Sequence, residues 1–139
     1  TDSIIFKFND YWWLITTYSN CGRFNESELH VFYSKEGPIT DNWIGLKKNP
    51  VVIDPDLGRN GGIFFEGKKI FRVAQSFGFN NYGKKISLRE IIKLDPENFV
   101  EKEIRSIEPK FLKKLLGIHH LHNNNIYNVH DFCKREFKY

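Results

Sequence analysis

Polar side chains that could bind a ligand are concentrated between Asp54 and Gly83, at the ends of an apolar hairpin. Arg59 and Arg72 each carry a planar fork of N–H donors, which suits carboxylates, phosphates and vicinal hydroxyls. Gln75 and Tyr82 add an amide and a phenol, which can both donate and accept hydrogen bonds. A stretch that keeps packing and polar groups this close together is interpreted as a binding site.

Each of these residues also has a structural interpretation. The two arginines could pair with an acid such as Asp54 or Asp56, and Gln75 and Tyr82 could form buried hydrogen bonds within a sheet. The pair Gly61–Gly62 either allows close approach of a neighbouring backbone or simply begins a strand. The sequence leaves these alternatives open.

Histidines near the C-terminus are the main metal-binding candidates. On a strand His120 and His122 share a face, and His130 lies across the hairpin, so a zinc site of two or three imidazoles is geometrically feasible. No Cys or carboxylate stands at a fixed spacing from them. We therefore expect no metal and no cofactor, and these three histidines remain candidates only.

The two cysteines, Cys21 and Cys133, are too few for a disulfide framework and lack metal-ligand spacing. Free thiols predict a reducing compartment, and hence a cytoplasmic location. A cysteine nucleophile working with one of the histidines is a further alternative.

The elements that position these groups are predicted to be β-strands. Aromatic residues make up 16% of the 139 residues, and flat rings pack well on a pleated surface. Apolar and alternating runs separated by turn signals predict ten strands. They cover SIIFKF, YWWLITTYS, ELHVFYSK, Trp43–Leu46, Gly61–Phe65, Lys69–Gln75, Ile86–Leu94, Phe99–Ile107, IHHLH and IYNVHDF.

Two of these stretches have helix as an alternative. SLREIIKL within Ile86–Leu94 and EPKFLKKLL within Ile107–Leu116 show apolar spacing near 3.6 residues. The second could form one or two helical turns between sheets. Neither alternative changes the all-β prediction.

A repeat organises the chain. Tyr11–Leu14, Ile70–Val73 and Ile126–Val129 align at intervals of 59 and 56 residues (70 − 11 and 126 − 70). A repeat of this length with four antiparallel strands is typical of a β-propeller blade. We predict about two and a half blades, over residues 1–53, 54–112 and 113–139 of one domain.

Composition excludes some functions. Hydrophobic residues make up 40% and charged residues 27%, as in a soluble globular protein, and no apolar run approaches the roughly 20 residues of a membrane span. The net charge of +4 comes from scattered Lys pairs, so nucleic-acid binding is not expected. The absence of Met indicates a processed product or a piece of a longer polypeptide, so the remaining blades, or another chain, are expected partners.

Several motifs in order carry a family resemblance: Asp2, Trp12-Trp13-Leu14, Trp43, Asn49-Pro50-Val51, Arg59-x-Gly61-Gly62, Phe71-Arg72-x-Ala74-Gln75 and Tyr82-Gly83. The chain resembles the five-bladed β-propeller domains related to arabinanases, levansucrases and family 43 glycoside hydrolases. Within this group it is most similar to the sugar-binding propeller found with bacterial sugar formyltransferases and glycosyltransferases. It is also similar to the N-terminal domain of plant glucosamine inositolphosphorylceramide transferases. The family's usual Arg-Pro-x-Gly is Arg59-Asn60-Gly61-Gly62 here, and its late His-Thr pair is His119-His120.

The resemblance implies a carbohydrate-binding domain that acts beside a transferase in glycan or glycoconjugate synthesis. It implies ligand-binding roles for Asp2, Arg59, Arg72, Gln75, Tyr82 and His119, with Asp131 as a partner of the histidines. Glycosidases of this group use three carboxylates, and only Asp2 matches one of them, the Asp that tunes the general acid. We therefore expect a domain that is not catalytic by itself. The alternatives are a glycoside hydrolase with its other carboxylates outside this chain and a non-catalytic interaction scaffold.

Overall fold

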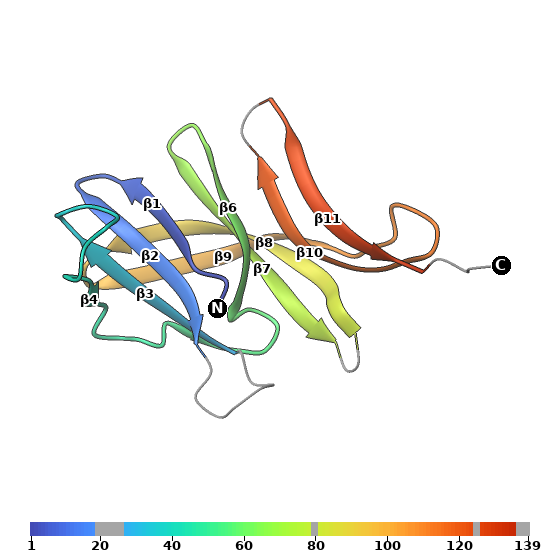
Figure 1. Ribbon diagram of the computed structural model, residues 1–139, viewed down its shortest axis with the longest axis horizontal. Helices are drawn as coiled ribbons and strands as arrows, with labels where there is room; N and C mark the ends of the chain where they lie inside the picture. Colours follow the sequence, from blue (N-terminus) through green and yellow to red (C-terminus); the bar gives the residue numbers. More distant parts are fainter. Residues whose placement is uncertain (19–26, 79–80, 124–125, 136–139) are drawn as a thin grey trace.

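The computed structural model describes residues 1–18, 27–78, 81–123 and 126–135. Eleven strands form three antiparallel sheets that follow one another along the chain, and no helix occurs among the described residues (Figure 1). The all-β prediction is therefore confirmed. No helix in the described part of the chain is long and apolar enough to cross a membrane.

The first sheet contains β1 (Ile4–Phe8), β2 (Tyr11–Tyr18), β3 (Glu28–Ser34), β4 (Ile44–Gly45) and β5 (Val52–Ile53). The strand order is β1-β2-β3-β4, and β5 also pairs with β3. The predicted turn at Asn9 and Asp10 joins β1 to β2. The predicted fourth strand is shorter than expected, with only Ile44 and Gly45 in β4. Beyond it the side chain of Asn49 hydrogen-bonds to both backbone groups of Val31, with distances of 2.9 and 2.8 Å.

The second sheet contains β6 (Arg59–Glu66), β7 (Lys69–Gly78), β8 (Asn81–Asp95) and β9 (Asn98–Ile107), in that order. The helical alternative for Ile86–Leu94 is wrong, because these residues lie within β8. The register between β8 and β9 shifts after Ile91, so that Ile92 is an extra residue on β8. This bulge brings Ile91 and Leu94 into one buried cluster and produces an apolar spacing that resembles a helix.

The turn between β8 and β9 is held by Asp95. Its carboxylate accepts hydrogen bonds from the side chain of Asn98 and the backbone N–H of Glu97, both at 2.9 Å. These bonds favour the ionised carboxylate and lower the pKa of Asp95, with the Asn98 bond having the larger effect.

The third sheet contains only β10 (Leu115–Asn123) and β11 (Asn128–Lys134). Residues 108–114 form a loop without a helical turn, so the helical alternative for this connection is also wrong. Every residue of β11 is exposed.

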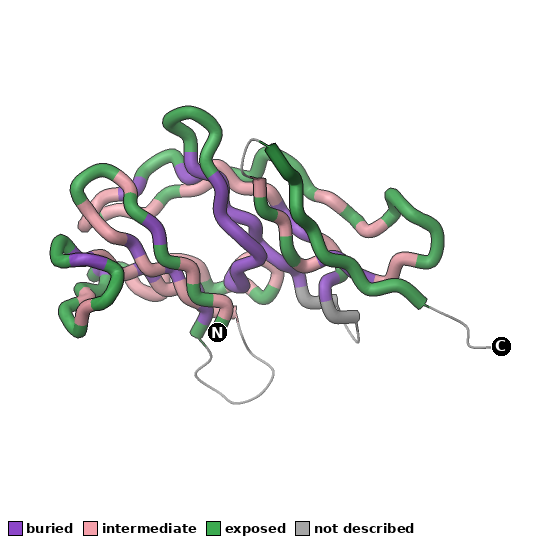
Figure 2. Tube along the Cα trace, turned by 45° about the horizontal axis from the view of Figure 1, so that its top comes forward, coloured by how far each residue is buried: buried purple, intermediate pink, exposed green. Residues whose placement is uncertain are grey.

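Two apolar cores lie on opposite faces of the second sheet. One joins it to the first sheet and includes Trp13, Ile15 and Ile70, and the other joins it to the third sheet and includes Val73 and Ile118. Because side chains alternate between faces along a strand, a strand between two cores is apolar on both sides. This explains the continuous burial of residues 59–64 on β6 and 70–76 on β7, which Figure 2 shows at the centre of the molecule.

Candidate functional site

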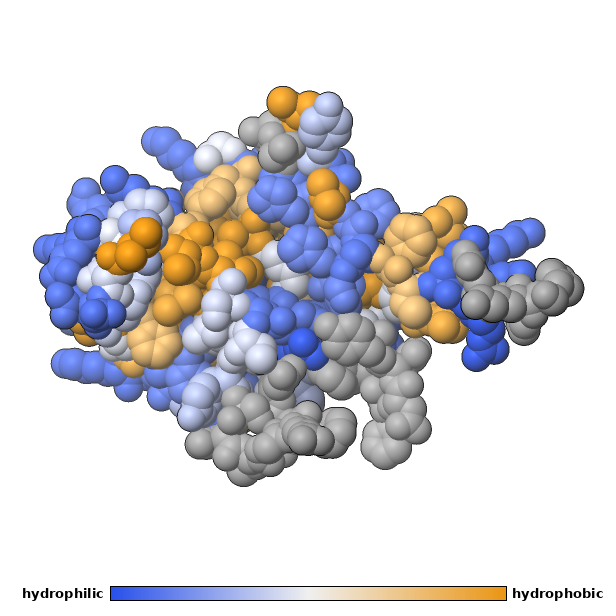
Figure 3. Space-filling view, in the orientation of Figure 1, coloured by the Kyte–Doolittle hydropathy of each residue, from blue (hydrophilic) through white to orange (hydrophobic). Residues whose placement is uncertain are grey.

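A pocket of about 470 Å³ lies along the first strands of the three sheets. The strands β1, β6 and β10 are neighbours, with β6 in contact with both others. The pocket is lined by residues 2–5, residues 60–63, Gln75, His119, His120, His122 and Asp131. In Figure 3 a hydrophilic strip over β10 separates two apolar patches on this face. The residues that line the pocket come from segments far apart in the sequence.

Asp2 is held in the pocket by contacts from β6 and β7. Its Oδ2 accepts hydrogen bonds from Arg59 Nε at 2.9 Å and Gln75 Nε2 at 3.3 Å, and its carbonyl accepts one from Asn60 Nδ2 at 3.0 Å. Its φ of 52° lies in the left-handed region, which Asp uses sparingly and which tends to be retained at functional sites. The Arg59 side chain is only 7% exposed, so it holds Asp2 from within the protein.

Two glycines on β6 let the third sheet come close. A Cβ at Gly61 would stand 2.3 Å from the carbonyl oxygen of His119, and one at Gly62 would stand 2.2 Å from that of Leu121. The register between β6 and β7 shifts here, so that Gly61 is an extra residue on β6. Of the two interpretations of this pair, the structure favours close backbone approach.

A second bulge faces the first. On β10, His119 and His120 together lie opposite Asp131 of β11, because the register shifts between Ile118 and Leu121. The Asp131 carboxylate accepts hydrogen bonds from both backbone N–H groups of the bulge, at 3.4 and 2.9 Å. A bulge disturbs the alternation of side chains. His119, His120 and His122 can therefore all line the pocket, whereas a regular strand would turn His119 away.

Two of the imidazoles have a defined donor atom. His119 Nδ1 lies 2.6 Å from Asp131 Oδ2, and His122 Nδ1 lies 3.0 Å from the carbonyl oxygen of Ile63. A carbonyl oxygen can only accept a hydrogen bond, and so can the carboxylate of Asp131 when it is ionised. Nδ1 is therefore the donor in each case. The Nε2 atom of each neutral imidazole is consequently a hydrogen-bond acceptor.

A family model described as glucosamine inositolphosphorylceramide transferase 1, N-terminal, matches residues 1–133. The chain belongs to this family. No curated protein and no solved structure matches it significantly.

This match confirms the similarity to the N-terminal domain of glucosamine inositolphosphorylceramide transferases that the sequence motifs indicate. It associates the chain with a glycosyltransferase-related family, which is consistent with glycoconjugate synthesis.

The structure brings together four of the ligand-binding residues that the sequence predicts. Asp2, Gln75 and His119 line the pocket, and Arg59 contacts Asp2. Tyr82 lies on β8, but its side chain is not among those described.

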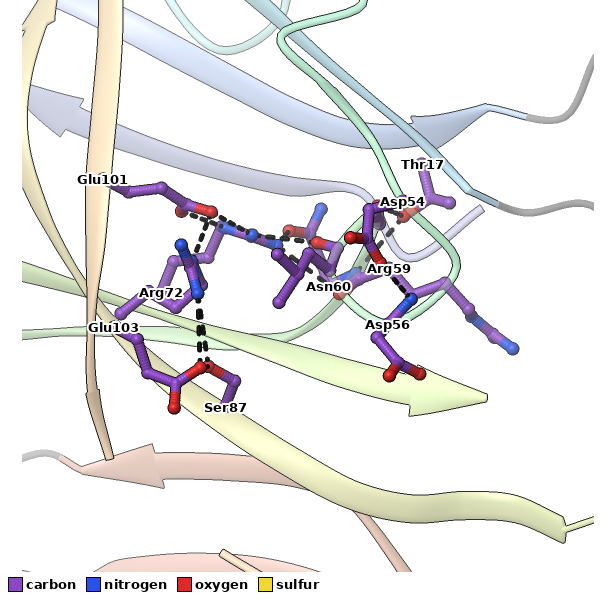
Figure 4. Close-up of polar contacts among 12 residues, drawn as sticks. Thr17, Asp54, Asp56, Arg59, Asn60, Arg72, Ser87, Glu101 and Glu103 are labelled. Atoms are coloured by element: carbon purple, nitrogen blue, oxygen red, sulfur yellow. Dashed lines mark hydrogen bonds and ion pairs between the residues drawn. The ribbon is translucent and has the colours of Figure 1, made fainter. Parts of the chain in front are cut away.

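Arg72, another of the expected ligand-binding residues, lies apart from the pocket lining. Its side chain is fully buried, and it forms an ion pair with Glu101 at 2.6 Å (Figure 4). All five N–H donors of its guanidinium are used: two bond to Glu101, one to Asn60 Oδ1, and two to the carbonyls of Leu57 and Arg59. Arg72 therefore connects the strands and lies outside the pocket lining.

The acids proposed as alternative partners of the arginines have another role. Asp54 Oδ1 accepts a hydrogen bond from the backbone N–H of Asp56 at 2.7 Å, and the Asp54 carbonyl accepts bonds from Leu57 and Gly58. They shape the turn that leads into β6. The actual acid partners, Asp2 and Glu101, are distant in sequence.

The remaining candidates lie apart from the pocket lining. His130 contacts the rings of Phe111 and Phe132 instead. Cys133 is exposed, and Cys21 lies outside the described residues. Within the described ranges, no group of three or more His, Cys, Asp and Glu side chains has the arrangement of a metal site.

Asn60 is a polar pocket residue that is not among the candidates predicted from the sequence. Its Nδ2 bonds to the carbonyls of Asp2 and Ile15, and its Oδ1 accepts from Arg72 at 3.2 Å. The available signal was its position between Arg59 and Gly61, where the resembled family usually has Pro.

Replacing Asp131 with Asn is expected to switch the tautomer of His119. The amide oxygen can still accept the two backbone N–H bonds of the bulge, but the amide nitrogen can only donate to Nδ1. We expect ¹⁵N NMR of the imidazole to show Nδ1–H in the native protein and Nε2–H in Asp131→Asn. His122 serves as the internal control, and an unchanged His119 spectrum would contradict the assigned donor.

Proposed function

We propose that this pocket binds a sugar or glycan and that the domain acts beside a transferase in glycan or glycoconjugate synthesis. The observation that carries the proposal is the convergence of β1, β6 and β10 on one polar pocket. Its volume of about 470 Å³ falls within the range of roughly 300–1,000 Å³ typical of small-molecule sites. Membership of a glycosyltransferase-related family supports the same function.

The lining offers both kinds of contact that a sugar ring needs. Ile4, Ile5 and Ile63 provide apolar surface for C–H groups, while Asp2 and Gln75 provide polar atoms for hydroxyls. Binding a sugar through apolar contacts and hydrogen bonds does not require a metal ion. The two aspartates of the lining already accept hydrogen bonds from protein groups, which supports binding in preference to hydrolysis.

We further propose that the three sheets are blades of a five-bladed propeller, over residues 1–53, 54–112 and 113–139. The sequential antiparallel sheets and their adjacent first strands support this arrangement. The pocket then corresponds to the central funnel. The remaining blades would come from further sequence or from another chain.

Replacing His122 with Ala is expected to weaken sugar binding by a few-fold to about tenfold, since a hydrogen bond of about 0.5–1.5 kcal/mol is lost. His130→Ala is the matched control, because His130 lies on the same hairpin but does not line the pocket. Binding is measured by glycan array and saturation-transfer NMR. Absence of binding by every sugar tested would instead favour the interaction scaffold.

A further inference from the structure

A second hollow, the tyrosine hollow, lies where the first sheet meets the turn between β8 and β9. Its volume is about 350 Å³, and it is lined by residues 33–36, Tyr11, Asn42, Ile44 and Pro96. None of the described residues that line it also lines the pocket between β1, β6 and β10. The tyrosine hollow is therefore a separate surface feature.

Two tyrosine rings form a corner in this hollow. The ring centroids of Tyr11 and Tyr33 lie 5.4 Å apart, and the interplanar angle is 86°. The buried indole of Trp13 contacts both rings, with centroid distances of 5.8 and 5.9 Å. The core thus holds the corner in place before any ligand binds. Aromatic-lined grooves are the surfaces on which proline-rich segments dock.

The side chains with unused hydrogen-bonding capacity in the hollow are donors. Neither tyrosine hydroxyl hydrogen-bonds to another described residue. Lys35 Nζ lies 5.5 Å from the centroid of the Tyr11 ring, and the described residues provide no ion-pair partner for it. A ligand that offers carbonyl oxygens and few N–H groups matches these donors. A proline-rich segment has this property, because proline lacks a backbone N–H and the polyproline II helix leaves its carbonyls unbonded.

The carboxylate in the hollow disfavours an anionic ligand. Glu36 accepts hydrogen bonds from Asn42 Nδ2 at 3.0 and 2.9 Å and from Thr40 Oγ1 at 2.8 Å. The Asn42 bond, and to a lesser extent the Thr40 bond, lower the pKa of Glu36, so this side chain is charged at neutral pH. A phosphate or carboxylate that approached Lys35 would meet this like charge as well. A neutral carbonyl oxygen avoids the repulsion.

We propose that the tyrosine hollow docks a proline-rich, extended segment of a partner polypeptide. The pyrrolidine rings pack into the corner between Tyr11 and Tyr33, while the two hydroxyls and Lys35 Nζ donate hydrogen bonds to carbonyl oxygens of the segment. This docking is independent of the sugar binding proposed for the pocket.

The test is a calorimetric titration of the complete protein with an acetylated and amidated decaproline peptide. A Gly-Ser peptide of the same length retains the carbonyls but lacks the pyrrolidine rings, and a Glu-rich peptide adds negative charge. We expect decaproline to bind at least about fivefold more tightly than either. Absence of decaproline binding at millimolar concentration would overturn the proposal, as would equal or tighter binding of one of the other two peptides.

Variants locate the binding. Tyr11→Phe combined with Tyr33→Phe keeps both rings and removes both hydroxyls, and the affinity for decaproline is expected to fall at least about fivefold. Tyr18→Phe is the matched control, because Tyr18 is exposed on the same sheet but does not line the hollow. An unchanged affinity in the double variant, or an equal fall in the control, contradicts the site. If the double variant does not fold, Lys35→Gln tests the exposed donor alone, with a fall of at least about twofold expected and an unchanged affinity contradicting the proposal.

Discussion

Replacing Glu101 with Gln is expected to lower the free energy of unfolding by about 3–5 kcal/mol, because it leaves the buried Arg72 cation without its counter-ion. The Glu101 side chain is only 5% exposed and receives hydrogen bonds from two arginines, Arg72 and Arg89. Arg72 bridges β6, β7 and β9, so the loss affects the whole second sheet. The measurement is equilibrium unfolding in urea, followed by circular dichroism.

Glu103→Gln is the matched control on the same strand. The Glu103 side chain is half exposed, and it lies 3.5 Å from Arg89 Nη1. Pairs of this kind contribute about 0–1 kcal/mol, since solvent screens them. If the two variants lose similar stability, the buried network does not stabilise the sheet in the way inferred.

The hairpins could be predicted from sequence because their information is local. The pair Asn9 and Asp10 marks a turn, and the residues on each side alternate between apolar and polar. These signals predicted β1, β2, β6 and β7. The propeller arrangement, by contrast, depends on how sheets assemble and remains a proposal.

The bulges could not be predicted, because a single inserted residue has little compositional signature. At Ile92 the insertion shifts the buried face of β8, and the resulting apolar spacing resembles that of a helix. At His119 the insertion changes which histidines share the pocket. Only the bulge at Gly61 had a signal, since consecutive glycines mark close backbone approach.

Partners of the buried charges were equally hidden. Arg59 pairs with Asp2 across 57 residues, and Arg72 pairs with Glu101 across 29. Both pairings depend on tertiary contacts and strand register, which a single sequence does not specify. Asp54 and Asp56 were nearer in sequence, but the turn that they form directs them elsewhere.

Replacing Gly62 with Ala is expected to lower stability in two ways and to disrupt the pocket. Gly62 has a φ of 139°, which side-chain-bearing residues rarely adopt, and this strain amounts to about 1–3 kcal/mol. The new Cβ would also stand 2.2 Å from the Leu121 carbonyl oxygen, so β10 must move. Overpacking of this kind adds about 1–3 kcal/mol.

Gly37→Ala separates the two effects. Gly37 has a similar φ of 146°, but nothing lies within 4 Å of the position that its Cβ would occupy. We expect Gly37→Ala to show the strain alone and to leave hydrogen exchange of the β10 amides unchanged. Gly62→Ala should lose more stability in urea, exchange faster along β10, and bind sugar more weakly because the three histidines move with that strand. Equal losses in the two variants would show that backbone strain dominates and that contact between β6 and β10 does not hold the histidines in the pocket.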